Sequence, residues 1–172
     1  MLELLLQGEK NFPRLTLPTV EQRDLRQLLL HRHRLVQMRT RVKNQLQALA
    51  MNQGVRQKSR LWSEKGRAQL QALELMPWGQ QRRDDLLQVL DQLEQRIAPL
   101  DRAVRQQAES RSEVRRMMTQ PGVGPVVALA YQLTILDPLR FATSRKLTSY
   151  LGLIPTVVIV VIDGLHLFRP SG

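Results

Sequence analysis

The stretch that decides the predicted fold is Pro121-Gly122-Val123-Gly124-Pro125, followed by the apolar residues 126–130. Glycine adopts the backbone conformations of a tight turn at no steric cost. Proline suits the first position of a helix, because its missing N–H would be unpaired there. The stretch therefore predicts a hairpin between two helices. The N–H groups at the start of the second helix form a positive dipole end that suits a phosphate oxygen. A plain helix–helix connection explains the same five residues equally well.

The charge balance is strongly positive. The 172 residues include 26 Lys and Arg against 15 Asp and Glu, for a formal net charge of +11. Most of these cations are arginine, which binds phosphate in a bidentate manner. Such an excess is typical of proteins that bind nucleic acid. The alternative is a basic surface that serves solubility alone.

Other features of the composition limit the possible class of protein. The chain has no cysteine, which excludes a disulfide framework and a thiolate metal site and fits the cytoplasm. Its N-terminal residues do not resemble a signal peptide, and no basic segment carries a bulky aromatic face for a membrane surface. Aromatic residues make up only 4%, which favours a helical core. We therefore expect a cytoplasmic, mainly α-helical protein without a membrane partner.

A first long helix is predicted from Thr19 to about Asn52. Thr19 and Gln22 have the spacing of a capping box, and Gly54 is a suitable C-terminal stop. Apolar residues recur every seven positions on this helix, as they do along a coiled-coil seam: Leu28, Leu35, Val42 and Leu49.

Basic residues cover much of the remaining surface of this predicted helix. A run of one charge sign repels itself unless a partner neutralises it, so we interpret the run as a nucleic-acid contact rather than a merely solvated face. The candidate DNA-binding residues, including those of the hairpin, are Arg32, Arg34, Arg39, Arg41, Lys43, Gly122, Val123 and Gly124.

A second long helix is predicted to begin near Gln80. Its apolar residues alternate in steps of four and three, the pattern of a coiled coil: Leu86, Leu90, Leu93, Ile97, Leu100 and Val104. The two long helices, joined by residues 54–79, form either an antiparallel hairpin or a dimer seam. The predicted fold class is therefore mainly α, with a long coiled-coil-like helical hairpin followed by a small helix-hairpin-helix domain.

Several segments, in order along the chain, resemble the IS-one-ten type insertion-sequence transposases, also called DEDD or serine transposases. The matching segments are 12–14, 21–26, 32–36, 39–46, 120–125, 140–141 and 146–155. The resemblance implies a RuvC-like nuclease domain with four metal-binding carboxylates, a coiled coil, and a C-terminal domain with a serine that attacks DNA. It also implies a structured guide RNA, oligomers assembled on DNA, and a divalent metal in the intact protein.

The resemblance suggests a division of the chain into four parts. These are a remnant helix and linker of a missing RuvC-like domain (1–18), a coiled-coil region (19–117), a partial helix-hairpin-helix transposase domain (118–155) and an aberrant tail (156–172). No motif places an acid for two-metal chemistry, which needs converging carboxylates. Glu3 and Glu9 match no catalytic position, and Asp84 and Asp85 suit the charge of a helix start. We therefore predict no catalytic residue, no metal ligand and no cofactor in this fragment.

The tail departs from the family, which continues with a polar, Ser-Gly-rich and then basic stretch. Residues 157–162 are instead all Val or Ile. Valine codons begin with GT and isoleucine codons with AT. Asp163 and Gly164 follow, with codons that begin with GA and GG. Read with the last base of each preceding codon, residues 157–164 can encode Ser-Ser-His-Ser-Gly-Asp-Arg-Arg. We therefore predict a single-base frameshift near Pro155, and Ser171 is not assigned the catalytic serine.

The sequence thus predicts a DNA-binding fragment of an insertion-sequence transposase, which takes part in DNA transposition and recombination but is catalytically incomplete. Its expected partners are DNA, the guide RNA of the element and a second copy of the chain through the coiled coil. The alternative is a non-catalytic coiled-coil interaction module. A third alternative is an intact enzyme with an unfamiliar site.

Overall fold

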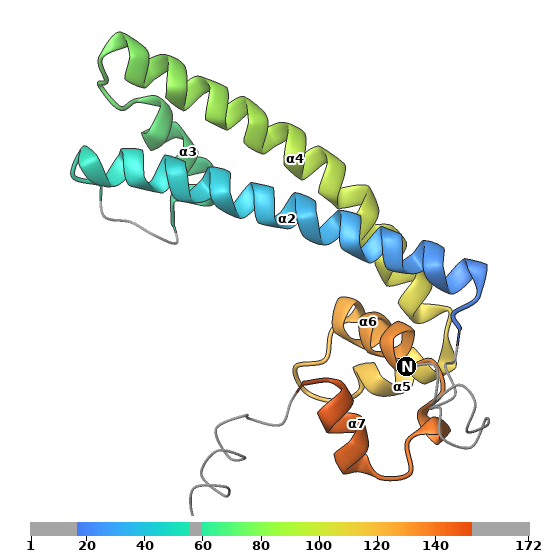
Figure 1. Cartoon of the computed structure of the whole chain (residues 1–172). Coiled ribbons are helices and arrows are strands. Elements are labelled where there is room, and N and C mark those ends of the chain that lie inside the picture. Colours follow the sequence, from blue (N-terminus) through green and yellow to red (C-terminus); the bar gives the residue numbers. More distant parts are fainter. Residues whose placement is uncertain (1–16, 56–59, 153–172) are drawn as a thin grey trace, which may run out of the picture. The chain divides into compact units, whose positions relative to one another are not determined.

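The computed structural model describes residues 17–55 and 60–152 (Figure 1). The regular structure of these residues is entirely helical, which confirms the predicted mainly α fold. The residues form two compact units, one of residues 18–134 and one that includes Leu17 and residues 135–152. The predicted remnant helix before Leu17 and the aberrant tail 156–172 lie outside the described residues. Among the described helices, none combines the length and the apolar character that crossing a membrane requires.

Two helices of 33 residues each, α2 (Val20–Asn52) and α4 (Pro77–Glu109), run side by side as an antiparallel hairpin (Figure 1). Apolar side chains of both helices are buried between them, namely Leu35, Val42, Leu46, Leu87, Leu90, Leu93 and Ile97. The periodic apolar residues of the two helices therefore pack against each other within one chain. Of the two arrangements compatible with the sequence, the structure contains the intramolecular hairpin.

The start and the end of α2 follow the predicted capping chemistry. The Gln22 N–H donates to Thr19 Oγ1 at 3.2 Å, and the Thr19 N–H donates to Gln22 Oε1 at 2.9 Å. Both bonds of the capping box are therefore present. Beyond the helix, Gly54 has a φ of 81°, a left-handed conformation that glycine adopts without strain.

Between the long helices lie η2 (Arg60–Trp62) and α3 (Glu64–Gln71). Helix α3 begins at Glu64 because Ser63 caps it, with its hydroxyl accepting from the Gly66 N–H at 3.2 Å. Likewise α4 begins at Pro77 instead of near Gln80, because proline is favourable in the first turn of a helix.

A buried arginine fastens α3 to α4. Arg83 is only 9% exposed, and its Nη1 donates to the carbonyl groups of Gln71 at 2.8 Å and Leu73 at 3.1 Å. These carbonyls lie at the end of α3, where the helix itself supplies no donors. Nearby, Trp62 packs against two of the apolar clusters, the one between α2 and α4 and the one that includes Leu61 and Leu70.

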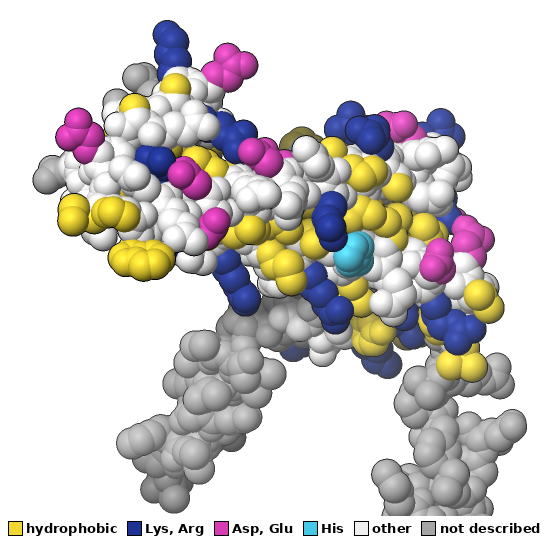
Figure 2. Space-filling view, turned by 90° about the horizontal axis from the view of Figure 1, so that it is seen from above, with side chains coloured by type: hydrophobic (Ala, Val, Ile, Leu, Met, Phe, Trp, Pro, Cys, Tyr) yellow, Lys and Arg dark blue, Asp and Glu magenta, His cyan; other side chains and the backbone are white. Residues whose placement is uncertain are grey.

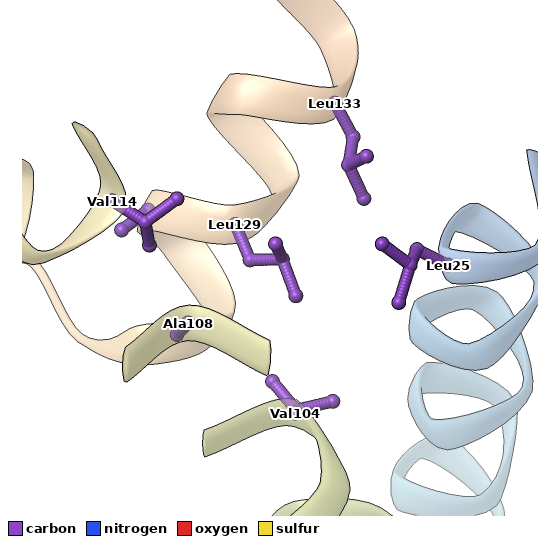
Figure 3. Close-up of a cluster of buried hydrophobic side chains, with 7 residues drawn as sticks. Leu25, Val104, Ala108, Val114, Leu129 and Leu133 are labelled. Atoms are coloured by element: carbon purple, nitrogen blue, oxygen red, sulfur yellow. The ribbon is translucent and has the colours of Figure 1, made fainter. Parts of the chain in front are cut away.

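At the other end of the hairpin, α5 (Ser112–Met118) and α6 (Pro125–Ile135) pack against α2 and α4. Figure 3 shows the side chains that meet there, Leu25, Val104, Ala108, Val114, Leu129 and Leu133. This cluster fixes the helix that follows the glycine-containing turn against both long helices.

The unit that contains residues 135–152 is built from η3 (Pro138–Arg140) and α7 (Ser144–Tyr150). The Arg140 guanidinium carbon lies 4.5 Å from the Phe141 ring centroid and 4.6 Å from that of Tyr150, so it stacks on both rings. Thr143 caps α7, since it has the extended backbone of a cap and its side chain accepts from the Lys146 N–H at 3.3 Å.

Candidate nucleic-acid interface

The turn between α5 and α6 depends on one left-handed glycine. Gly122 has a φ of 82°, and a Cβ added there would meet no atom within 4 Å. Its requirement for glycine is therefore conformational rather than steric. The next residue, Val123, donates its N–H to the Gln120 carbonyl at 3.1 Å and packs its side chain against the core. Val123 thus holds the turn in place.

Unused amide groups lie at the start of α6. The Gly124 carbonyl accepts from the Ala128 N–H at 3.0 Å, so Gly124 directly precedes the first helical turn, where Pro125 has no N–H. The amides of Val126 and Val127 donate to no group within the described ranges. These amides form the positive end of the helix dipole, which favours an anion.

Two of the five candidate cations on α2 are engaged with α4. Arg32 Nε lies 2.6 Å from Asp101 Oδ1, and Lys43 Nζ lies 3.3 Å from Glu94 Oε1. Lys43 Nζ also lies 4.9 Å from the centroid of the Trp62 ring. Both charges are therefore neutralised by acids across the hairpin.

Arg34 and Arg41 have different surroundings. They are exposed, and a spacing of seven places them on the same side of α2 about 10 Å apart. Arg23, also exposed, precedes Arg34 by eleven residues and shares that side. Across residues 17–55 and 60–152, no acid lies within ion-pair distance of these three arginines. The structure therefore brings two of the predicted residues together with Arg23, which the prediction left out.

Arg39 lies on the flank of α2 that faces α4, seven residues after Arg32, and is half-buried. Unlike Arg32, it forms no ion pair with any described residue. The predicted basic face is thus divided into an outward row and an inward row, with Arg39 in the inward row. The sequence could not reveal this division, because it depends on where the acids of α4 lie.

Two further exposed cations lie beside the turn. Arg115 and Arg116 form part of the last turn of α5, only a few residues before Gly122. The sequence alone could have indicated these two arginines as candidate DNA-binding residues, because they lie close to the glycines of the turn. Figure 2 shows that basic side chains on the face it presents are spaced along the molecule with acidic ones among them. The positive charge on this face is distributed rather than collected in one patch.

The acidic residues that the structure describes show no arrangement for holding a metal ion. Within the part of the chain that the structure describes, no group of three His, Cys, Asp or Glu side chains converges. Asp84 accepts a hydrogen bond from Arg83 Nε at 2.8 Å, and this bond lowers the pKa of its carboxyl below the usual range. Asp84 therefore remains ionised and orients the arginine that ties α3 to α4.

The chain is similar to known transposases. Residues 114–158 match the family model described as the transposase IS116/IS110/IS902 family. A probable family 20 transposase of Pseudomonas aeruginosa is 29% identical over 148 residues, which is 80% of this chain and 42% of the relative. The transposase for insertion sequence element IS1111A of Coxiella burnetii is 29% identical over 141 residues, or 80% of this chain and 39% of the relative. No solved structure matches significantly.

The chain spans about two fifths of the length of these curated relatives. The family match begins at Val114 in α5 and includes the turn, α6, η3 and α7. The similarity to the two relatives extends over most of the chain, beyond the segment that the family model matches. Together, these matches confirm the resemblance read from the sequence, and they relate the chain to the IS-one-ten type insertion-sequence transposases.

Proposed function

We propose that this chain is the DNA-binding part of an insertion-sequence transposase and grips the nucleic-acid backbone without cutting it. The observation that carries the proposal is the outward row of Arg23, Arg34 and Arg41. These side chains are exposed and lie away from the acids that neutralise Arg32 and Lys43. Arginines repeated along one side of a helix can meet successive phosphates of a strand.

The turn before α6 supports the same function. The amides of Val126 and Val127 are available for a phosphate oxygen, and Arg115 and Arg116 add positive charge nearby. Contacts of this kind position a protein on the backbone and do not read base sequence. Gly122 then acts by shaping the turn, Gly124 leaves the start of α6 open to a phosphate, and Val123 anchors the turn to the core.

The remaining parts of the proposal concern the intact transposase. Strand cleavage and the binding of the divalent metal are carried out by other regions of the transposase. This chain acts in the cytoplasm, where it binds DNA and the guide RNA of the element. The seam itself does not support the expected self-association through the coiled coil, because Leu46 and Leu90 are already buried between α2 and α4 of one chain. The alternative, a coiled-coil interaction module, needs an apolar face that is still open.

An electrophoretic mobility-shift titration of the full chain with duplex DNA at two salt concentrations tests the proposal. Binding should weaken steeply as salt rises, because each neutralised phosphate releases counterions. Affinity that does not depend on ionic strength, or no complex at low salt, would contradict it. A titration with a single-stranded RNA of matched length separates a DNA preference from general polyanion binding.

A further inference from the structure

A groove of about 190 Å³ opens between α5 and α6, next to the turn that joins them. Its walls are almost entirely apolar, and its only polar side-chain groups are the amide of Gln120 and the hydroxyl of Tyr131. Val127 borders the groove with 57% of its surface exposed. The groove therefore has room for a flat apolar group that also has a polar edge.

The charges beside the groove indicate what kind of molecule would bring such a group. Arg116 precedes Gln120 by four residues, a spacing that places both on one side of α5 and its extension. Glu113 is the acid on this side, and its carboxylate accepts from Gln132 Nε2 at 2.9 Å. At the turn, the backbone amide of Val127 is unused, although the same residue lines the groove. Glu113 keeps its negative charge, but Arg115 and Arg116 in the last turn of α5 are both exposed and outnumber it beside the turn.

We propose that the groove receives one unpaired base of the nucleic-acid strand that the turn holds, an inference that rests on the proposed function. Because Val127 also lines the groove, a phosphate bound at its amide belongs to the nucleotide whose base enters the groove or to the next nucleotide along the strand. The base stacks on the Tyr131 ring, and the Gln120 amide donates to or accepts from the polar edge of the base. A base in an intact duplex is stacked and paired and cannot enter, so the groove selects for unpaired or extruded bases.

The test compares the affinity of the full chain for two probes, a duplex and the same duplex with a single-nucleotide bulge. Wild type should prefer the bulged probe by about fivefold or more, the effect expected of stacking on one aromatic ring. Tyr131→Leu should abolish this preference without changing the affinity for the duplex, and Tyr131→Phe should retain it. A fluorescent 2-aminopurine at the bulge should be quenched by wild type and less so by Tyr131→Leu.

An exposed position provides a second variant that does not threaten the fold. Val127→Ala removes part of the groove wall and should reduce the preference for the bulge. Val89→Ala is the matched control, because Val89 is 42% exposed on α4, outside the groove, and its replacement should leave the preference unchanged.

Each negative result points to a different failure. Equal affinity of wild type for both probes, or a preference that survives in Tyr131→Leu and Val127→Ala, overturns the groove inference and leaves backbone binding intact. Absence of binding to either probe at low salt overturns the proposed function as well. A change of oligomeric state in the groove variants, measured by sedimentation without a change in probe preference, would assign the groove to a second copy instead.

Discussion

Arg26 on α2 donates from Nε to the backbone carbonyl of Leu133 on α6 at 3.0 Å, although 107 residues separate them in sequence. Nη2 of the same guanidinium donates to the same oxygen. The Leu133 carbonyl lies in the last turn of α6, where the helix supplies no donors of its own and the dipole is negative. A positive side chain from the first turns of α2 thus completes the end of the helix that begins at the turn.

Replacing Arg26 should therefore loosen α6. We expect Arg26→Ala to lower the free energy of unfolding by about 1 to 2 kcal/mol, the usual scale for a hydrogen bond from a charged donor that is half-buried. Urea unfolding followed by circular dichroism measures this change. Arg23→Ala is the control, since Arg23 is exposed and makes no ion pair with a described residue. Equal stability of the two variants would show that the bond to Leu133 contributes nothing.

The two glycines of the turn should respond differently to alanine. Gly122→Ala should destabilise the protein by about 1 to 2 kcal/mol, because its left-handed φ disfavours a side chain. Gly124→Ala should leave stability within about 0.5 kcal/mol, since Gly124 has no left-handed φ and a Cβ there meets no atom within 4 Å.

Gly124→Ala can therefore separate folding from binding at this turn. The proposed function predicts that this folded variant binds DNA more weakly, because its methyl group occupies the approach of a phosphate to the start of α6. Thermal melting checks the fold and a mobility-shift titration measures the affinity. Full affinity in a folded Gly124→Ala protein would favour the simple helix–helix connection.

The hydrogen bond between Arg83 and Asp84 should make the free energy of unfolding depend on pH. The folded pKa of Asp84 is lowered by the hydrogen bond from Arg83, so the ionised form favours the folded state. This contribution is complete above the unfolded pKa near 3.9, declines as the pH falls through the folded pKa, and is absent below it. The stability difference between wild type and Asp84→Asn, measured by urea unfolding from pH 7 to pH 3, should shrink over that window.

A difference that is constant with pH would contradict this account. The pKa itself can be measured by NMR titration of the Asp84 carboxyl in the folded protein. A value in the usual range for aspartate would show that the Arg83 bond does not persist in solution.

Local sequence signals predicted much of the fold, because they act over a few residues. Thr19 and Gln22 specified the start of α2, and the turn glycines specified the gap between α5 and α6. The cap of α3 at Ser63 was missed, since basic residues around it obscured the short helix that follows.

The partners of the cations could not be predicted in the same way. Arg32 and Arg34 are two residues apart and alike in chemistry, yet only Arg32 faces an acid of α4. Which residue is neutralised depends on the register of α2 against α4, a long-range packing relation that spacing along one helix does not contain. The same holds for Arg26, whose partner is more than one hundred positions away.

This division of the α2 cations predicts two distinct mutant behaviours. Arg34→Gln combined with Arg41→Gln should leave stability nearly unchanged, because neither side chain has an ion-pair partner among the described residues. If each arginine neutralises one phosphate, the pair should reduce the slope of log affinity against log salt by about 2, from roughly 0.9 for each phosphate contact. Mobility-shift titrations at several salt concentrations provide the slope.

The matched double variant is Arg32→Gln combined with Lys43→Gln, which removes the same formal charge from the same helix. Because these two cations face Asp101 and Glu94, their loss leaves two acids on α4 unpaired and should act mainly on stability. Exposed ion pairs contribute little, so the expected loss is below about 1 kcal/mol for each pair. Equal reduction of the salt slope by both double variants would mean that DNA is attracted by total charge alone, and that the outward row is not a specific contact.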